Sequence, residues 1–249
     1  MKTVHFISDL HLSATTPRIT ERFLAYLDGP ARTASALFVL GDLFDAWPGD
    51  DCLESPDDGF NRQIATALKR LSQADVSLSI MHGNRDFLLG TAFASATGAR
   101  LVDDPFLLDL GTQSFVPAHG DALCTDDAPY QEFRAQVRSP AWQQSFLARP
   151  LAERKAIANA LRQQSEVAKR EKLSNARQYE MDVSETAVER LLADYEFAPL
   201  IHGHTHRPDD HYHQVGAHSI RRHVLADWRD DRGEYLLWNG NALERCPLP

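Results

Sequence analysis

The chain has 249 residues, which is long enough to bury a large hydrophobic core and fits one large domain, or one domain with an insertion. Its composition is ordinary for a globular protein, and no apolar run approaches the roughly 18 residues that a membrane-spanning helix needs. The formal net charge of −9 argues against nucleic acid as a general binding partner.

The N-terminus and the cysteines both favour a cytoplasmic protein. Residues 1–3 lead directly into a strand pattern, without the charged and apolar regions of a signal peptide. Cys52, Cys124 and Cys246 are irregularly spaced, which indicates free or buried thiols rather than a disulfide framework or a zinc ribbon. The sequence predicts no obligate protein partner.

The first third of the chain predicts alternating strands and helices. Apolar runs over 4–7 and 37–40 indicate buried strands, and residues 20–27 between them have the spacing of an amphipathic helix. A strand, a helix and a second strand in this order imply a parallel pair. After a surface loop over 48–59, we expect a helix over 61–73 and a strand over 76–81.

The rest of the chain predicts a hairpin, a long helical region and several closing strands. Residues 106–110 and 114–116, with a turn at Gly111 between them, indicate a hairpin or two adjacent strands. Residues 130–172 and 181–194 have helical patterns, and a short strand follows at 200–201. We expect residues 222–225 and 235–238 to be the closing strands of a second sheet.

Side chains that can bind metals follow the apolar runs, at the point where each run ends. They are Asp9, His11, Asp42, Asn84, His119, His204 and His206. Each motif alone is weak, because Asp-x-His pairs often cap turns and Gly-Asn is itself a turn signal. Since strands of an α/β sheet deliver functional groups to one edge, the motifs together predict a metal site.

These residues can fill two metal positions that share one carboxylate. The first position takes Asp9, His11, Asp42 and His206, and the second takes Asp42, Asn84, His119 and His204. Two ions bridged by Asp42 would lie ~3.5–4 Å apart, and a hydroxide shared between them would be the nucleophile. Mixed carboxylate, amide and imidazole ligation suits Mn²⁺, and also iron or Zn²⁺.

The motifs resemble, in this order, those of the calcineurin-like metallophosphoesterases. They are Asp9-x-His11, Gly41-Asp42, Gly83-Asn84, His119-Gly120 and Gly203-His204-x-His206. The resemblance spans most of the chain. It implies a single α/β domain over residues 1–249, built as a four-layer α/β/β/α sandwich with a helical cap inserted at residues 128–180.

Longer stretches around the motifs resemble one branch of this superfamily, the UDP-2,3-diacylglucosamine hydrolases of lipid A biosynthesis. The stretches are residues 8–12, 40–47, 82–90, 119–121, 124–127 and 202–208. The resemblance implies hydrolysis of the substrate's pyrophosphate bond to UMP and 2,3-diacylglucosamine 1-phosphate. It also implies two Mn²⁺ per chain and a metal-activated water that attacks the α-phosphorus.

Arg85 stands where the superfamily commonly has a histidine that protonates the leaving group. Arginine cannot act as an acid at neutral pH, but its planar guanidinium binds phosphate oxygens in pairs. A phosphate leaving group needs less help from an acid than an alkoxide does, so Arg85 fits pyrophosphate cleavage. We therefore expect Asp42, Asn84 and Arg85 to be the catalytic residues.

The same resemblance places a set of substrate contacts. They are Asn84, Arg85, Asp127, Ser165, Lys169, Lys172 and His204. Spacings of four and three residues independently put Ser165, Lys169 and Lys172 on one face of a helix. There they would present a hydroxyl and two cations to a glucosamine phosphate.

Residues 134–177 are basic and carry many apolar side chains on an otherwise acidic chain. They hold ten Arg or Lys, three Glu and no Asp. The segment is either a solvated helical face or a cap that meets an anionic substrate or membrane. Its apolar side chains either pack on the core or line an acyl-chain pocket, and Arg149, Arg154 and Lys155 are candidates for lipid headgroup contacts. We expect a peripheral protein on the cytoplasmic face of the inner membrane.

Two other functions remain open from the sequence. The same metal centre could act on soluble nucleotides or other phosphodiesters, with the insertion serving only as a structural cap. The chain could also be a non-catalytic scaffold on this fold, as the retromer scaffold subunit is. A scaffold predicts eroded metal ligands, whereas every ligand position here holds a suitable residue type.

Overall fold

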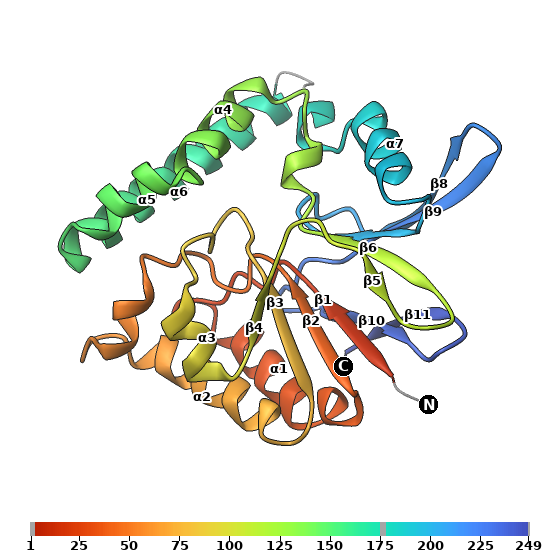
Figure 1. The fold of residues 1–249 in the computed structure, drawn as a ribbon. Helices are drawn as coiled ribbons and strands as arrows, with labels where there is room; N and C mark the ends of the chain where they lie inside the picture. The colour runs from red at the N-terminus through yellow and green to blue at the C-terminus, as the bar shows by residue number, and fades with distance from the viewer. Residues whose placement is uncertain (1–2, 175–177, 249) are drawn as a thin grey trace.

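Two β-sheets form the centre of the computed structural model, which describes residues 3–174 and 178–248 (Figure 1). The first sheet contains, in spatial order, β11 (Leu243–Pro247), β10 (Glu234–Trp238), β1 (Val4–Ile7), β2 (Ala36–Leu40), β3 (Ser77–Met81) and β4 (Arg100–Val102). Strands β1 to β4 run parallel, and β10 and β11 close the other side as an antiparallel pair. The parallel pairing of β1 with β2 confirms the expected β-α-β unit.

The second sheet combines two hairpins with a parallel centre. Its order is β5 (Leu108–Asp109), β6 (Ser114–Ala118), β7 (Leu200–His202), β9 (His218–Val224) and β8 (Asp209–Val215). β6, β7 and β9 are parallel, whereas β5 and β8 pair antiparallel with their hairpin partners. The hairpin expected around Gly111 is therefore confirmed.

Helices cover the outer faces of both sheets. The helices over the first sheet are α1 (Pro17–Asp28), α2 (Gly59–Ser72) and α3 (Thr91–Thr97), and α7 (Glu185–Asp194) covers the second. Short 3₁₀ helices occupy the connections: η1 (Pro30–Thr33), η2 (Asp50–Glu54), η3 (Asp121–Leu123) and η4 (Gln178–Met181). The four-layer α/β/β/α sandwich is confirmed.

The alternation of side chains along β1 and β2 explains why the first sheet lies between two hydrophobic layers. Phe6 and Phe38 point into the layer between the sheets, whereas Ile7 and Val39 point toward the helices. Every residue of β1 is buried, as expected for a strand covered on both faces. Full burial of each such side chain contributes about 1.5–3 kcal/mol to folding.

Three helices lie across one end of the sandwich (Figure 1). They are α4 (Ala128–Val137), α5 (Pro140–Leu147) and α6 (Leu151–Ser174). Breaks at residues 138–139 and 148–150 divide the region that the sequence predicts as one helical stretch. At the first break, the N-cap Ser139 accepts a hydrogen bond from the Trp142 backbone N–H. These helices occupy the predicted insertion, residues 128–180, and its action as a cap stays a prediction.

The structure corrects two expectations about the chain. Residues 235–238 lie in β10 of the first sheet, not in the second, because Leu236 and Trp238 fill the layer between the sheets from that side. The segment 48–59 is not simply a surface loop. Cys52 is buried, and the Asp50 carboxylate accepts hydrogen bonds from the backbone of Gly90 and Phe93.

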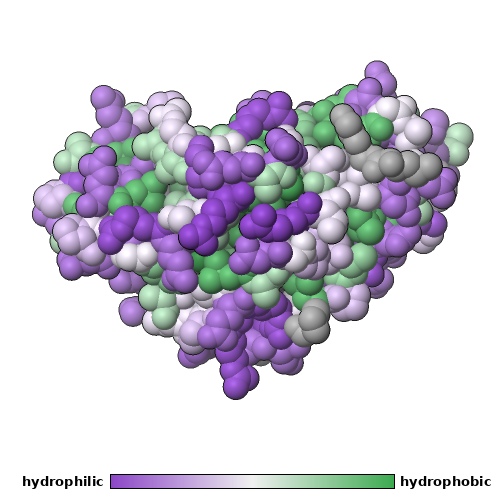
Figure 2. Space-filling model, turned by 90° about the horizontal axis from the view of Figure 1, so that it is seen from below, coloured by the Kyte–Doolittle hydropathy of each residue, from purple (hydrophilic) through white to green (hydrophobic). Residues whose placement is uncertain are grey.

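The surface opposite the α4–α6 end is covered mainly by hydrophilic side chains, with hydrophobic ones between them (Figure 2). None of the helices in the described part of the chain combines the length and apolar character needed to cross a bilayer. The three cysteines are free thiols, and Cys52 and Cys124 are buried, as the sequence indicates.

Candidate metal centre

The predicted ligands meet where the carboxyl ends of β1, β2 and β3 face those of β6 and β7. Each ligand follows its strand by a few residues, so the parallel strands of both sheets deliver them to one edge. The structure brings together all of the side chains proposed from the sequence: Asp9, His11, Asp42, Asn84, His119, His204 and His206.

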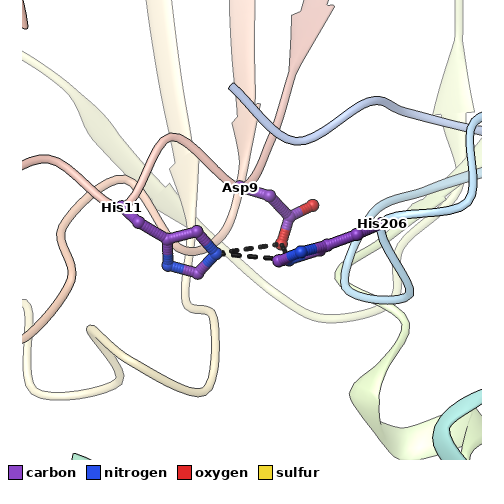
Figure 3. A group of neighbouring side chains, drawn as sticks. All are labelled: Asp9, His11 and His206. Carbon is purple, nitrogen blue, oxygen red and sulfur yellow. Dashed lines mark hydrogen bonds and ion pairs between the residues drawn. The ribbon is translucent and has the colours of Figure 1, made fainter. Parts of the chain in front are cut away.

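Asp9, His11 and His206 form the first cluster (Figure 3). The two Nε2 atoms of the histidines lie 3.2 Å apart, and that of His206 lies 3.5 Å from Asp9 Oδ1. Asp9 Oδ1 is buried and accepts no hydrogen bond from the described residues. A buried carboxylate oxygen facing two imidazole nitrogens fits a divalent cation.

Asp42, Asn84, His119 and His204 form the second cluster. Asn84 Oδ1 lies 3.0 Å from His119 Nε2 and 2.9 Å from His204 Nδ1. Asp42 reaches both clusters, because its Oδ1 lies 3.8 Å from His119 Nε2 and its Oδ2 lies 3.8 Å from His11 Nδ1. This placement is what a bridging carboxylate requires.

Groups behind the ligands fix the orientation of two histidine rings. His119 Nδ1 lies 2.9 Å from the Leu40 carbonyl, to which it donates, so that Nε2 faces the cluster. His206 Nδ1 lies 3.6 Å from the carboxylate of Asp227, a residue that the sequence reasoning missed. Carboxylates and carbonyls behind metal-binding histidines hold the ring and its tautomer in this way.

Several of these ligands have strained backbones. The φ angles of Asp9, His11, Asp42, His204 and His206 lie between 48° and 66°. Non-glycine residues rarely adopt this left-handed region, and such strain gathers at functional sites that the surrounding structure holds in place. Five of the eight non-glycine residues with positive φ in the described chain are thus proposed ligands.

Glycines allow the ligand loops to approach one another. A Cβ at Gly83 would lie 2.0 Å from Asp42 Oδ1, and one at Gly203 would lie 2.1 Å from Asp9 Oδ2. Gly41 has a φ of 89°, and a Cβ there would lie 2.5 Å from His119 Nδ1. Space therefore requires the glycine that precedes each of Asp42, Asn84 and His204, and at Gly41 the positive φ requires it as well.

Asp86 joins the loop after β2 to the loop after β3. Its buried carboxylate accepts hydrogen bonds from the backbone N–H groups of Gly83 at 2.8 Å and Leu43 at 2.8 Å, and from those of Asp42 and Phe44 at 3.3 Å. Asp86 belongs to the Gly-Asn-Arg-Asp motif at residues 83–86. The spacing of this motif does not show whether Asp86 joins the two loops or binds a metal.

The protonation of the ligands also favours bound cations. Burial lowers the pKa values of His11 and His204 to about 3, so both rings are neutral and can donate a lone pair. Burial, together with the charges of Asp86 and Asp9, raises the pKa of Asp42 to about 7. Asp42 in turn raises the pKa of His119 to about 9 despite its burial. The carboxylates around the second cluster therefore favour the binding of a positive charge there, either a proton or a metal cation.

Arg85 contributes a fixed positive charge beside the clusters. Its backbone N–H donates to Asp42 Oδ1 at 2.8 Å. Its guanidinium is close enough to lower the pKa of both Asp42 and His11. The side chain is half-buried, as a group that meets a phosphate at the mouth of a site would be.

The other expected substrate contacts lie on or next to helices α4 and α6. Lys172 forms an ion pair with Asp127 and lies 3.9 Å from Glu180. Ser165 is exposed. The side chain of Lys169 lies outside the described part of the structure. The charge of Lys172 is therefore already shared with two carboxylates.

The expectation that Arg154 contacts lipid headgroups is wrong, and that for Lys155 stays a prediction. Arg154 is 2% exposed and donates to the Asp51 carboxylate, and Lys155 pairs with Asp58 at 2.6 Å. The acidic loop after β2 lies under α6 and neutralises both cations. Of the three candidates only Arg149 is exposed.

The apolar side chains of α5 and of the first half of α6 mainly pack on the core. Phe146 is buried, and Trp142, Leu151 and Ile157 pack against the core of the first sheet. The rings of Trp142 and Phe146 stack at 4.7 Å. Val167, farther along α6, is 54% exposed. The core-packing alternative therefore holds for the first part of this region.

A buried network, which the sequence reasoning missed, joins α4 to the centre. The Asp121 carboxylate accepts from Tyr130 Oη at 2.7 Å, Arg134 Nε at 2.9 Å and Arg138 Nη2 at 3.3 Å. Arg138 also donates to the Gly83 carbonyl at 3.1 Å. The helices that cross the end of the sandwich are thereby fixed to the loop that carries Asn84 and Arg85.

Comparison with known proteins decides the family. The family model described as calcineurin-like phosphoesterase matches residues 2–208. The chain belongs to the calcineurin-like phosphoesterases. As a member of this family it is a metal-dependent hydrolase with a divalent cation as cofactor, and the geometry above fits such ions.

Three curated relatives extend the similarity over nearly the whole chain, and all are named UDP-2,3-diacylglucosamine hydrolase. The chain is 49% identical to that of Aromatoleum aromaticum, over 94% of this chain and 92% of the relative. It is 47% identical to those of Chromobacterium violaceum, over 98% of both chains, and Chromohalobacter salexigens, over 93% and 91%.

Proposed function

We propose that this phosphoesterase hydrolyses the pyrophosphate bond of UDP-2,3-diacylglucosamine, giving UMP and 2,3-diacylglucosamine 1-phosphate in lipid A biosynthesis. The observation that carries the proposal is the near-full-length identity of 47–49% to hydrolases named for this substrate. It includes the helices α4–α6, which a similarity of the metal centre alone would not cover.

The two clusters would hold two divalent cations and would share the Asp42 carboxylate. The residues are Asp9, His11, Asp42, Asn84, His119, His204 and His206. When bound, the ions supply an acidified water and neutralise phosphate charge. This mixed carboxylate, amide and imidazole set suits Mn²⁺ as well as iron or Zn²⁺, and we take Mn²⁺ as the metal, with two ions per chain.

The roles of the catalytic residues follow from their positions. The Arg85 backbone N–H donates to the Asp42 carboxylate and holds it in place. Asp42 can then present one oxygen to each cluster. Asn84 presents its oxygen to His119 and His204 and its amide to the substrate. The Arg85 guanidinium binds pyrophosphate oxygens and stabilises the charge that develops as the phosphate leaves.

The sugar phosphate and acyl chains lie against the cap at residues 128–180 of the single domain 1–249. Asp127, Ser165, Lys169 and Lys172 bind the glucosamine phosphate, with Asn84, Arg85 and His204 on the metal side. The exposed side chains Leu147, Arg149 and Val167 give this cap apolar and cationic groups. These groups would rest on the anionic cytoplasmic surface of the inner membrane.

Product analysis in ¹⁸O-labelled water tests the reaction. UDP-2,3-diacylglucosamine is incubated with the protein, with and without Mn²⁺, and the products are followed by phosphorus NMR and mass spectrometry. Label in UMP, only when Mn²⁺ is present, is the expected result, since water attacks the α-phosphorus. Absence of turnover on this lipid, together with Mn²⁺-dependent cleavage of a soluble diester, would move the assignment to soluble phosphodiesters.

A further inference from the structure

A pocket of about 190 Å³ lies beside the candidate metal centre, lined by residues from the segment between η4 and α7, from the loop after β7 and from strands β8 and β9. The side chains that decide its chemistry are Asp182, Thr205, Arg207, Asp209, His211 and Arg222. None of them belongs to the ligands or substrate contacts assigned above. We refer to this space as the Arg222 pocket.

Arg222 is a buried cation held by two neutral partners. The residue is 6% exposed, and its Nε and Nη1 groups donate to His213 Nε2 at 3.0 Å and His202 Nε2 at 3.1 Å. A guanidinium can only donate, so both Nε2 atoms accept and neither carries a proton on the side that faces Arg222. A buried charge without an ionic partner is costly, and the guanidinium has further N–H groups to donate. It therefore favours an anion in the pocket.

Thr205 adds a second group that lacks a partner. It stands between His204 and His206, and its Oγ1 is buried without a hydrogen-bond partner among the residues that the structure describes. Buried hydroxyls in native proteins are nearly always hydrogen-bonded. A ligand oxygen in the pocket would supply the missing partner.

Two carboxylates on the same pocket restrict which anion fits. Asp182 forms an ion pair with Arg207, and Asp209 Oδ1 accepts from the Asp210 backbone N–H at 2.8 Å. Both attract Arg222 at longer range, but neither lies within ion-pair distance of it. Their remaining lone pairs can accept a proton donor, whereas they repel an anion that has only acceptors.

We propose that the Arg222 pocket binds a phosphate group that retains a P–O–H proton, either inorganic phosphate or the singly ionised form of a phosphate monoester, whose second pKa is about 6. Arg222 and Thr205 donate to its oxygens, and its own O–H donates to Asp182 or Asp209. Sulfate has the same shape but is fully ionised at neutral pH, so it lacks the proton that the carboxylates need. The pocket therefore selects phosphate over sulfate.

Calorimetric titration of the full-length, Mn²⁺-loaded protein with inorganic phosphate tests the proposal. The metal centre can bind phosphate too, so the wild type is expected to show two sites. Arg222→Gln should weaken only the pocket site by about tenfold or more, since a charge-assisted hydrogen bond is lost. Arg221→Gln is the matched control, because Arg221 is the next residue of β9 but is exposed and lies over the Tyr212 ring.

If Arg222→Gln does not fold, Thr205→Val provides a second variant with which to measure phosphate binding at the pocket. The substitution preserves shape and the Arg222 contacts, and it should also weaken the pocket site. Wild-type phosphate binding in both variants would overturn the proposal, and so would sulfate binding as tight as phosphate at this site. Binding of this ion does not depend on which substrate the metal centre hydrolyses.

Kinetics distinguish the two sources of the phosphate. If the pocket receives the monoester product, Arg222→Gln should weaken inhibition by UMP, while Arg221→Gln should not. If the pocket receives free phosphate, Arg222→Gln should weaken phosphate binding at the pocket and leave inhibition by UMP unchanged. Either result supports a phosphate site at Arg222.

Discussion

Gly83 determines, at the scale of a single residue, how closely the loops of the metal centre can approach. A Cβ there would meet Asp42 Oδ1 at 2.0 Å, and Asp42 is the carboxylate that both clusters share. Gly83→Ala should therefore displace Asp42 and lower kcat by about 100-fold, as misplacements of ~1 Å do.

The control for Gly83→Ala is Gly59→Ala, because the atom nearest to an added Cβ at Gly59 lies 3.9 Å away. This change at the start of α2 should leave kcat within about twofold, because the new methyl group meets only ordinary contacts. Initial-rate measurements on both variants, with melting curves to confirm folding, make the comparison. Equal kcat values for Gly83→Ala and Gly59→Ala would show that catalysis tolerates a displacement of Asp42.

Arg85 carries the second prediction at this scale. Its guanidinium is expected to act on charge that develops during cleavage, so Arg85→Ala should lower kcat by about 100-fold or more and change KM little. Arg85→Lys should recover part of the loss, since it keeps the charge but not the paired hydrogen bonds. A rise in KM alone would indicate that Arg85 only binds substrate.

Residue types and spacing were sufficient to predict which side chains the structure brings together at the candidate metal centre, because each of them follows its strand within the same local segment. Asp227 and Asp121 were not predictable in this way. Asp227 supports His206 from a distant part of the chain, and Asp121 contacts three side chains of the α4 region. Such contacts exist only after the segments pack, so local sequence carries no sign of them.

At the scale of elements, Asp86 connects two strand ends. It accepts hydrogen bonds from four backbone N–H groups of the loops after β2 and β3. In Asp86→Asn the amide would turn N–H donors toward some of these N–H groups. We expect the free energy of unfolding to fall by about 2–3 kcal/mol and metal binding to weaken. Urea unfolding and Mn²⁺ titration measure the two effects, and unchanged values of both would exclude this role.

Strands that carry apolar runs were predictable, whereas polar edge strands were not. β8 has the sequence Asp-Asp-His-Tyr-His-Gln-Val, and most of its side chains are exposed or half-buried. Its register comes from backbone pairing with β9 instead of from a buried face. The sequence also did not predict which sheet β10 joins, because a strand with an alternating pattern can pair within either sheet.

At the scale of the whole molecule, the metal centre depends on both sheets. Asp9, His11, Asp42 and Asn84 come from the first sheet, and His119, His204 and His206 from the second. The ligands span residues 9 to 206, so the site exists only in the folded domain. Bound cations are thus expected to stabilise the fold, since they bind the folded state and not the unfolded chain.

His5 makes the stability of the whole fold depend on pH. It is 1% exposed on β1, its Nδ1 lies 3.1 Å from Tyr26 Oη, and its ring stacks on Tyr235 at 4.4 Å. Burial lowers the pKa of His5 from 6.5 to about 4. Between these pH values the unfolded chain binds a proton that the folded protein does not, so the free energy of unfolding falls as pH falls from 6.5 toward 4.

The contribution of His5 to this loss is on the order of 2 kcal/mol. His5→Gln keeps a partner for Tyr26 but cannot titrate, so the variant should lose correspondingly less stability over the same interval. Urea unfolding of both proteins at pH 6.5, 5.5 and 4.5 measures the difference, in which the contributions of the other titrating groups cancel. Parallel pH profiles for the two proteins would mean that the buried ring accepts its proton without cost to the fold.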